Sequence, residues 1–152
     1  MIVLLALLAP CLAMSQVVRG EVLISQEEAS LPVHPSVKGP TLTVRSPVRK
    51  PTVEIENHTA PGELRSPLNF SVKFKPHGGA QIDLKTVRVT YLRSPQIDLT
   101  SRLKSFISVS GIDLTKAEVP PGEHFIKIEL QDTKGIETQL TIKLIVKPGD
   151  RR

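Results

Sequence analysis

Two stretches of alternating apolar and polar residues near the C-terminal end constrain the fold more than any other feature of the chain. Residues 124–130 alternate His, Ile, Ile and Leu with Phe, Lys and Glu, and residues 140–146 resume the pattern with Leu, Ile, Leu and Val. A period of two is typical of a strand with one buried face. Asp132–Gly135 lies between them and combines an acceptor side chain with a glycine, as a tight turn requires. These residues predict an antiparallel hairpin.

The same alternation recurs upstream. It is clearest at Leu68–Lys75, present at Thr52–Glu56 and Thr86–Tyr91, and weaker at Ile112–Val119. Six or seven short strands, separated by Pro- and Gly-containing turns at intervals of roughly ten residues, predict an all-β antiparallel sandwich of about seven strands. The expected core consists of the apolar residues on the alternating faces: Val53, Ile55, Leu68, Phe70, Val72, Phe74, Val87, Val89, Tyr91, Ile126, Ile128, Leu130, Ile142 and Leu144.

Residues 98–108 allow two interpretations. Asp98 suits the start of a short helix, because Leu99, Leu103 and Phe106 then recur at helical spacing. The alternative is a strand over residues 106–109. We favour the helix, which would be an addition to a plain seven-strand pattern.

The charge distribution argues against a nucleic-acid-binding surface. The chain of 152 residues has a net charge of +5, but residues 37–50 contain four basic and no acidic residues, whereas residues 51–147 contain thirteen basic and eleven acidic ones. The excess therefore lies in a proline-rich segment. Aromatic residues for base stacking are few, with no Trp and one Tyr. We interpret the basic excess as the charge of a solvated linker.

The N-terminal end has the pattern of a secretory signal. Ile2–Ala13 is uncharged, apolar and too short to cross a bilayer, and cleavage after Ala13 would remove it. No Lys or Arg precedes this run, and a buried N-terminal element is the alternative. Cys11 is the only cysteine, so a mature chain would form no disulfide. Pro10 occupies a position where a lipoprotein box has a small residue, which argues against lipidation of Cys11.

These patterns divide the chain into three regions. Residues 1–13 are the expected signal peptide, residues 14–50 a Pro-rich stalk or linker, and residues 51–148 the folded domain. Prolines at four positions in residues 32–47 disfavour both helix and sheet in the second region. Val17–Ser25 and Thr41–Arg45 could each form a short strand there.

Four features of residues 50–148 resemble the immunoglobulin-like domains of bacterial exported and cell-surface proteins. They are the opening Pro51–Ile55, the sequence Ala60–Glu63 before a strand that ends at Pro76, Pro121–His124 leading into a strand, and Gln131–Gly135 before the last strand. The resemblance implies a spacer, adhesion or assembly role in the cell envelope, in the periplasm or outside the cell. It implies another envelope or extracellular protein as partner, and no active site.

Metal ligation is the second possibility that the sequence raises. The tripeptide Ile-Asp-Leu recurs three times at a spacing of fifteen residues, which includes Asp98 and Asp113. If these carboxylates met Asp132 at one pole of a sandwich, they could bind Ca²⁺, which prefers six to eight oxygen ligands. His58 and His77 flank one strand and could approach each other to hold copper or zinc. No ligand run of known spacing supports either site, so solvated turn residues are the favoured interpretation.

His124 stands apart from the other three histidines, because it shares a predicted strand face with Ile126 and Ile128. We expect a partly buried ring that is hydrogen-bonded to the backbone and fixes the start of that strand.

Two common catalytic motifs are missing from the sequence, Gly-x-Ser-x-Gly and a phosphate-binding loop, and without Trp a sugar-binding platform is not expected. We therefore expect a non-enzymatic structural or protein-interaction module without a cofactor. The alternatives are a periplasmic protein that binds a ligand or a metal such as Ca²⁺ or copper, and an enzyme whose site is built from dispersed acidic residues.

Overall fold

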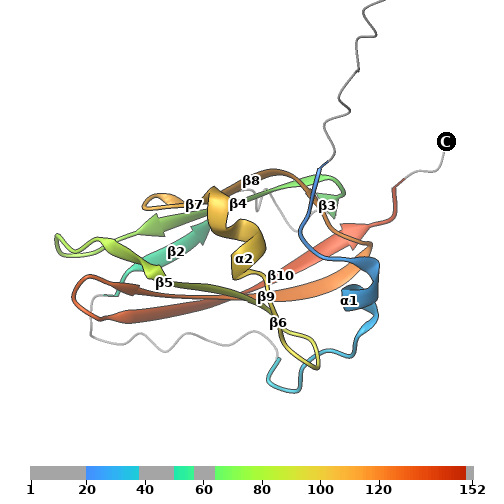
Figure 1. Cartoon of the computed structure of the whole chain (residues 1–152), viewed down its shortest axis with the longest axis horizontal. Helices are drawn as coiled ribbons and strands as arrows, with labels where there is room; N and C mark the ends of the chain where they lie inside the picture. The colour runs from blue at the N-terminus through green and yellow to red at the C-terminus, as the bar shows by residue number, and fades with distance from the viewer. Residues whose placement is uncertain (1–19, 38–49, 57–63, 150–152) are drawn as a thin grey trace, which may run out of the picture.

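The computed structural model describes residues 20–37, 50–56 and 64–149, and it shows two five-stranded sheets packed face to face (Figure 1). In the first sheet the strand order is β1-β8-β4-β2, with β7 also paired to β8, and in the second it is β3-β10-β9-β5-β6. The strands are β1 (Glu21–Val22), β2 (Thr52–Ile55), β3 (Leu64–Arg65), β4 (Leu68–Lys75), β5 (Ile82–Tyr91), β6 (Ile97–Asp98), β7 (Ile107–Ser108), β8 (Gly111–Glu118), β9 (Gly122–Asp132) and β10 (Glu137–Lys147). The helices are α1 (Gln26–Ser30), α2 (Thr100–Leu103) and the 3₁₀ turn η1 (Lys104–Phe106).

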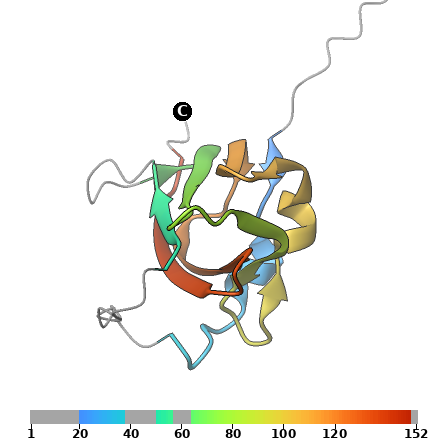
Figure 2. The ribbon, with the colours of Figure 1, turned by 90° about the vertical axis from the view of Figure 1, so that its left-hand side faces the viewer.

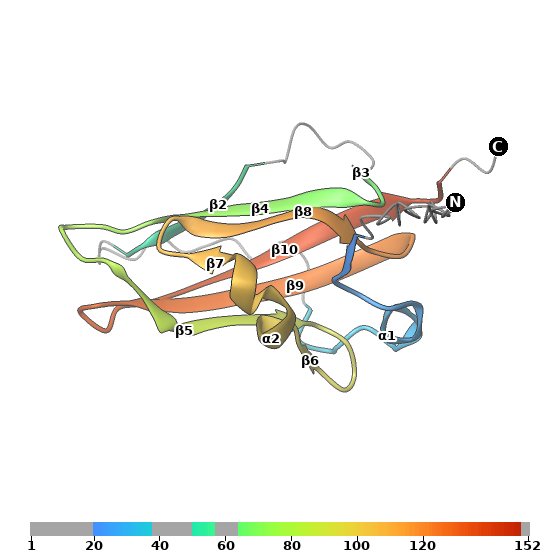
Figure 3. The same cartoon turned by 45° about the horizontal axis from the view of Figure 1, so that its top comes forward.

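The expected all-β class is confirmed, and the expected core is largely in place. Thirteen of the fourteen predicted core residues are buried, and Ile55 is half-buried. Figure 3 shows β4 and β8 in one layer and β5, β9 and β10 in the other, with the inner faces of both layers turned toward each other. Alternation in each strand therefore places one apolar face in the common core.

The sequence led us to expect a wholly antiparallel sandwich, but two of the strand pairs are parallel. β1 pairs with β8 in parallel at Val22 and Glu118, and β3 pairs with β10 in parallel at Leu64 and Val146. Both parallel pairs involve two-residue strands at the rim of a sheet. After each of these strands the chain passes to the other sheet instead of turning back in a hairpin, which is why alternation alone did not predict them.

Residues 98–108 combine both interpretations that the sequence left open. Thr100–Leu103 forms α2, η1 follows, and Ile107–Ser108 then forms β7. A carboxylate oxygen of Asp98 accepts a hydrogen bond from the Thr100 backbone N–H at 2.7 Å. This bond satisfies the first free amide of α2, but the N-cap residue is Leu99, which makes no side-chain cap hydrogen bond, so Asp98 contacts the helix start from one residue farther upstream than a cap.

The segment Gly20–Val37, called here the N-terminal strap, packs against both sheets. Leu23 and Ile24 belong to the hydrophobic core, with exposures of 0% and 2%, and their N–H groups donate to the Glu118 carbonyl. Farther along, Val33 forms an antiparallel bridge with Arg93 at the end of β5. The strap thus joins β8 of the first sheet to the β5 side of the second. In Figure 2 its first part, with β1 and α1, lies with α2 on one flank of the molecule, while β2 and β10 lie on the opposite flank.

This strap falls in the range that the sequence assigned to a stalk. The expected signal peptide at residues 1–13, together with residues 14–19 and 38–49 of the expected stalk, lies outside the described residues.

Candidate functional site

A buried polar cluster joins Tyr91, Arg93 and His124 beneath the strap. Tyr91 and His124 are fully buried, and Arg93 is 8% exposed. The Tyr91 hydroxyl lies 2.7 Å from His124 Nδ1, and Arg93 Nε donates to the same hydroxyl oxygen at 2.7 Å. His124 Nε2 lies 2.8 Å from the Pro120 carbonyl oxygen.

These partners determine the protonation state of the histidine. The Pro120 carbonyl can only accept, so His124 carries its proton on Nε2 and donates it there. Arg93 can only donate, which leaves the Tyr91 hydroxyl hydrogen free to be donated to Nδ1. Burial lowers the pKa of His124, and the nearby positive charge of Arg93 lowers it further, against an opposing effect of the hydrogen bond to Pro120. Burial likewise raises the pKa of Tyr91. Both side chains are therefore neutral inside the fold.

Arg93 connects this cluster to two backbone segments. Its Nη1 donates to the Leu31 carbonyl in the strap at 3.1 Å, and its Nη2 donates to the Glu123 carbonyl at 2.9 Å. Three donors of the guanidinium are thus used within the molecule. The cluster therefore links the strap to β5 and β9.

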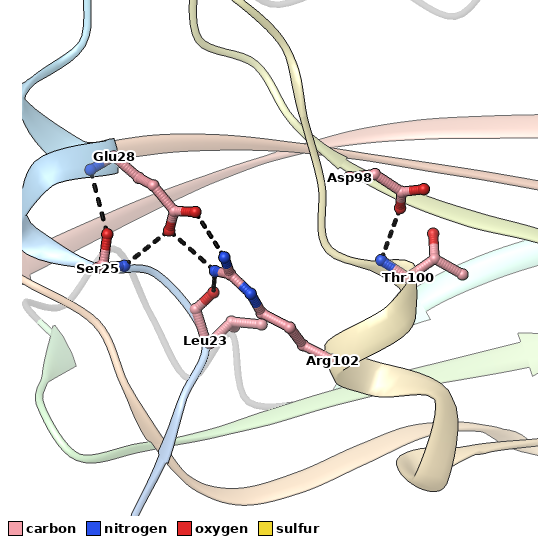
Figure 4. A network of polar contacts seen from close by, with 6 residues as sticks. All are labelled: Leu23, Ser25, Glu28, Asp98, Thr100 and Arg102. Atoms are coloured by element: carbon pink, nitrogen blue, oxygen red, sulfur yellow. Dashed lines mark hydrogen bonds and ion pairs between the residues drawn. The ribbon is translucent and has the colours of Figure 1, made fainter.

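A second polar network fastens the other end of the strap (Figure 4). Arg102 of α2 contacts both carboxylate oxygens of Glu28, at 2.6 and 2.8 Å, and donates to the Leu23 carbonyl at 2.9 Å. Glu28 also accepts from the Ser25 backbone N–H, while the Ser25 hydroxyl accepts from the Glu28 N–H, so the pair forms a capping box on α1. The Arg102 hydrogen bond is the main cause that lowers the pKa of Glu28 to about 2.

The structure does not bring together those metal-ligand candidates that lie in its described residues. His77 is exposed in the turn after β4, Asp98 is exposed at the end of β6 and accepts from the Thr100 N–H, and Asp113 is exposed on β8. Among the described residues, no group of three or more His, Cys, Asp or Glu side chains could hold a metal ion. His58 lies outside the described residues.

Of the candidates in the described residues, Asp132 alone is buried, at 3% exposure. Its Oδ1 accepts from the backbone N–H groups of Lys134 and Ile136, both at 2.9 Å, which shapes the turn between β9 and β10. The same turn meets the turn after β4, because Lys134 Nζ donates to the Gly78 carbonyl at 2.8 Å. His77 and Asp132 therefore belong to the same end of the molecule, but the contacts of Asp132 are those of a turn residue.

An open depression of about 600 Å³ lies beside β5 and α2. Its lining combines apolar, hydroxyl and basic side chains: Leu84, Lys85, Val87, Thr100, Ser101, Lys104 and Ile107. A bulge in β5 forms one wall, since the pairing with β9 shifts register between Asp83 and Arg88. Lys85 and Lys104 are exposed, and no carboxylate is among the residues that line the depression.

The outer edge of β10 is the longest open strand edge that the described residues present. β9 pairs with β10 along its whole length, whereas β3 meets its other edge only at Val146 and Lys147. Because Asp132 N–H donates to the Ile136 carbonyl, alternation turns the backbone groups of Gln139, Thr141 and Lys143 away from β9. This edge offers backbone donors and acceptors to another strand.

Sequence reasoning anticipated His124 and missed the two arginines. The predicted backbone hydrogen bond of His124 is confirmed, although the ring is fully buried. Ser25 and Glu28 have the spacing of a capping box, directly after the apolar pair Leu23–Ile24, and this signal in the sequence would have indicated a helix inside the strap. Nothing in the local sequence indicates that Arg93 is buried, because its carbonyl partners lie at distant positions.

No family model, curated protein or solved structure matches the chain. In the part of the chain that the structure describes, no helix is long and apolar enough to cross a bilayer.

Proposed function

We propose that this protein is a non-enzymatic, exported module with an immunoglobulin-like β-sandwich, which acts as a structural or protein-interaction component of the cell envelope. The strand order supports the immunoglobulin-like assignment. If β2, β4, β8 and β7 are strands A, B, E and D, and β5, β9 and β10 are strands C, F and G, their neighbours follow the order of that fold. The strap, β3, β6 and α2 are additions to it.

The observation that carries the functional proposal is how the buried polar side chains are used. Arg93 and His124 hold backbone carbonyls, and Asp132 holds backbone amides within a turn. A catalytic site needs such groups aimed at a substrate, with room for it beside them. Here the polar side chains stabilise the fold, while the open edge of β10 remains available for contact with another protein by strand addition.

Export rests on the apolar segment Ile2–Ala13, which has the length and ending of a signal peptide. Its removal would leave a chain with no cysteine, consistent with a domain whose stability comes from its core rather than from disulfides.

The test is affinity capture with the purified full chain from an envelope extract, followed by binding of the captured protein in purified form. We expect a saturable protein partner. Turnover of a substrate by the purified chain would overturn the proposal.

The alternative is a metal-binding periplasmic protein. A thermal-shift series with Ca²⁺, Cu²⁺ and Zn²⁺ distinguishes the two functions. Stabilisation by one ion that disappears in His77→Ala or Asp98→Ala would favour the metal-binding function.

A further inference from the structure

We propose that two copies of this chain pair through the outer edges of their β10 strands, so that the two second sheets continue into one another. This inference rests on the proposed interaction function and names a second copy as a partner. In Figure 2, β10, in red, lies on the flank opposite α1 and α2.

The edge is suited to strand pairing. Residues 137–145 read Glu-Thr-Gln-Leu-Thr-Ile-Lys-Leu-Ile, which are mostly residues of high β propensity with one charge of each sign. Among the described residues, no strand covers this edge between Glu137 and Ile145. Long exposed edges of this composition pair readily with other chains.

Symmetry and charge select one register. A two-fold axis at Leu140 places Glu137 of one copy opposite Lys143 of the other, and the reverse pair follows by symmetry. Gln139 then lies opposite Thr141. All four residues have backbone groups turned away from β9, so the opposed residues form the hydrogen-bonded pairs of an antiparallel ladder.

The side chains of these pairs lie on the solvent side of the sheet. Glu137 and Lys143 are exposed; within one chain Lys143 pairs with Glu123 at 2.8 Å and Glu137 accepts from Gln131 at 2.6 Å. Across the two strands the carboxylate and the ammonium would add an ion pair to these contacts. An edge lysine usually prevents pairing, because it would meet an apolar or basic neighbour. In this register it meets a carboxylate instead, and opposite charges in direct cross-strand positions are stabilising.

The inner face of the strand is also compatible with pairing. Leu140 is only partly buried against the core. The two Leu140 side chains would meet at the axis as a non-hydrogen-bonded pair, where Cα atoms lie about 4.5 Å apart. Association would remove their remaining apolar surface from water.

The first test is charge exchange on the full chain, followed by sedimentation velocity. A single strand pair forms a small, transient interface, so the measurement extends to roughly 300 µM protein. Each of Glu137→Lys and Lys143→Glu turns two attractive pairs into two repulsive ones, and we expect dimerisation to weaken about 10–30-fold. The double exchange restores the attraction in the opposite sense and should return the dimer. Lys75→Glu, an exposed reversal on β4, is the matched control and should leave the dimer unchanged.

The second test fixes the register through a disulfide. In a Cys11→Ser background, Leu140→Cys should form a covalent dimer under mild oxidation, because opposed non-hydrogen-bonded positions match disulfide geometry. Thr138→Cys lies opposite Ile142 in this register and should stay monomeric.

A monomeric wild-type chain at the highest concentration would overturn the inference, as would two single variants that dimerise as well as the wild type. Either result leaves the proposed function standing if another protein is captured from the envelope extract. If the chain dimerises but captures no other protein, the result supports the dimer and not the proposed envelope function.

Discussion

Acidification between pH 7 and pH 5 should destabilise the fold through His124. The folded structure holds this ring neutral, because burial and the charge of Arg93 lower its pKa below the ordinary value of 6.5. An unfolded chain frees the ring, which then binds a proton with that ordinary pKa. Below about pH 6.5 the unfolded state therefore binds more protons than the folded state, and the stability falls as the pH falls.

The structure explains why the folded protein disfavours a second proton on the His124 ring. A proton on Nδ1 would face the Tyr91 hydroxyl, which already accepts from Arg93 and would have to reverse its own hydrogen. It would also place a second positive charge beside the guanidinium. If the folded ring stays neutral throughout, the loss of unfolding free energy from pH 7 to pH 5 reaches about 2 kcal/mol, with a limiting slope of about 1.4 kcal/mol per pH unit.

Urea unfolding followed by circular dichroism measures this loss. His124→Gln keeps a donor for Pro120 and an acceptor for Tyr91 without a titrating ring, so its stability should change little across the same range. His77→Gln is the matched control, because that histidine is exposed, and it should keep the wild-type pH dependence. A wild-type stability that is flat from pH 7 to pH 5, or an equal slope in His124→Gln, would refute the reasoning.

Three further predictions concern the strap. Arg102→Ala should lower the unfolding free energy by about 1–2 kcal/mol, because it leaves the Glu28 carboxylate and the Leu23 carbonyl without their donor; a urea midpoint equal to that of the wild type would contradict this. Leu23→Ala should lower the unfolding free energy by about 2–4 kcal/mol because it creates a cavity, whereas Val22→Ala, at a half-exposed neighbour, should lower it by less than about 0.5 kcal/mol. Similar losses for both variants would show that Leu23 is not in the core. Because the pKa of Glu28 is lowered to about 2, its contribution to the unfolding free energy should be complete above about pH 4.5 and should be lost as the pH falls toward 2. Glu28→Gln should therefore make the stability depend less on pH between pH 4.5 and pH 2. An unchanged dependence in this range would exclude the role of Glu28.

The strands with strict alternation could be predicted from the sequence. Leu68–Lys75 and the last hairpin have apolar residues at every second position, and the structure buries those residues in the core. Residues 111–118 gave a weaker signal for a physical reason. Lys116 has a φ of +60°, and the register of β8 against β4 shifts near it, so the buried residues Leu114 and Ala117 are three positions apart instead of two.

The strap could not be predicted with the same rules. Pro32 and Pro35 mark its second half as irregular, and its strand has only two residues. Its place is determined by Leu23 and Ile24 in the core and by Arg93 and Arg102, whose partners are distant backbone carbonyls and one carboxylate. Contacts of this kind depend on the tertiary arrangement, which local patterns do not encode.

The most direct test of the packed strap is amide hydrogen exchange at Leu23 and Ile24 in the full chain, followed by NMR. Both amides donate to the Glu118 carbonyl inside the core, so they should exchange as slowly as the central amides of β8. Exchange at the rate of an unstructured peptide would show that residues 20–37 are not part of the folded body, and the roles assigned to Arg93 and Arg102 would then be wrong.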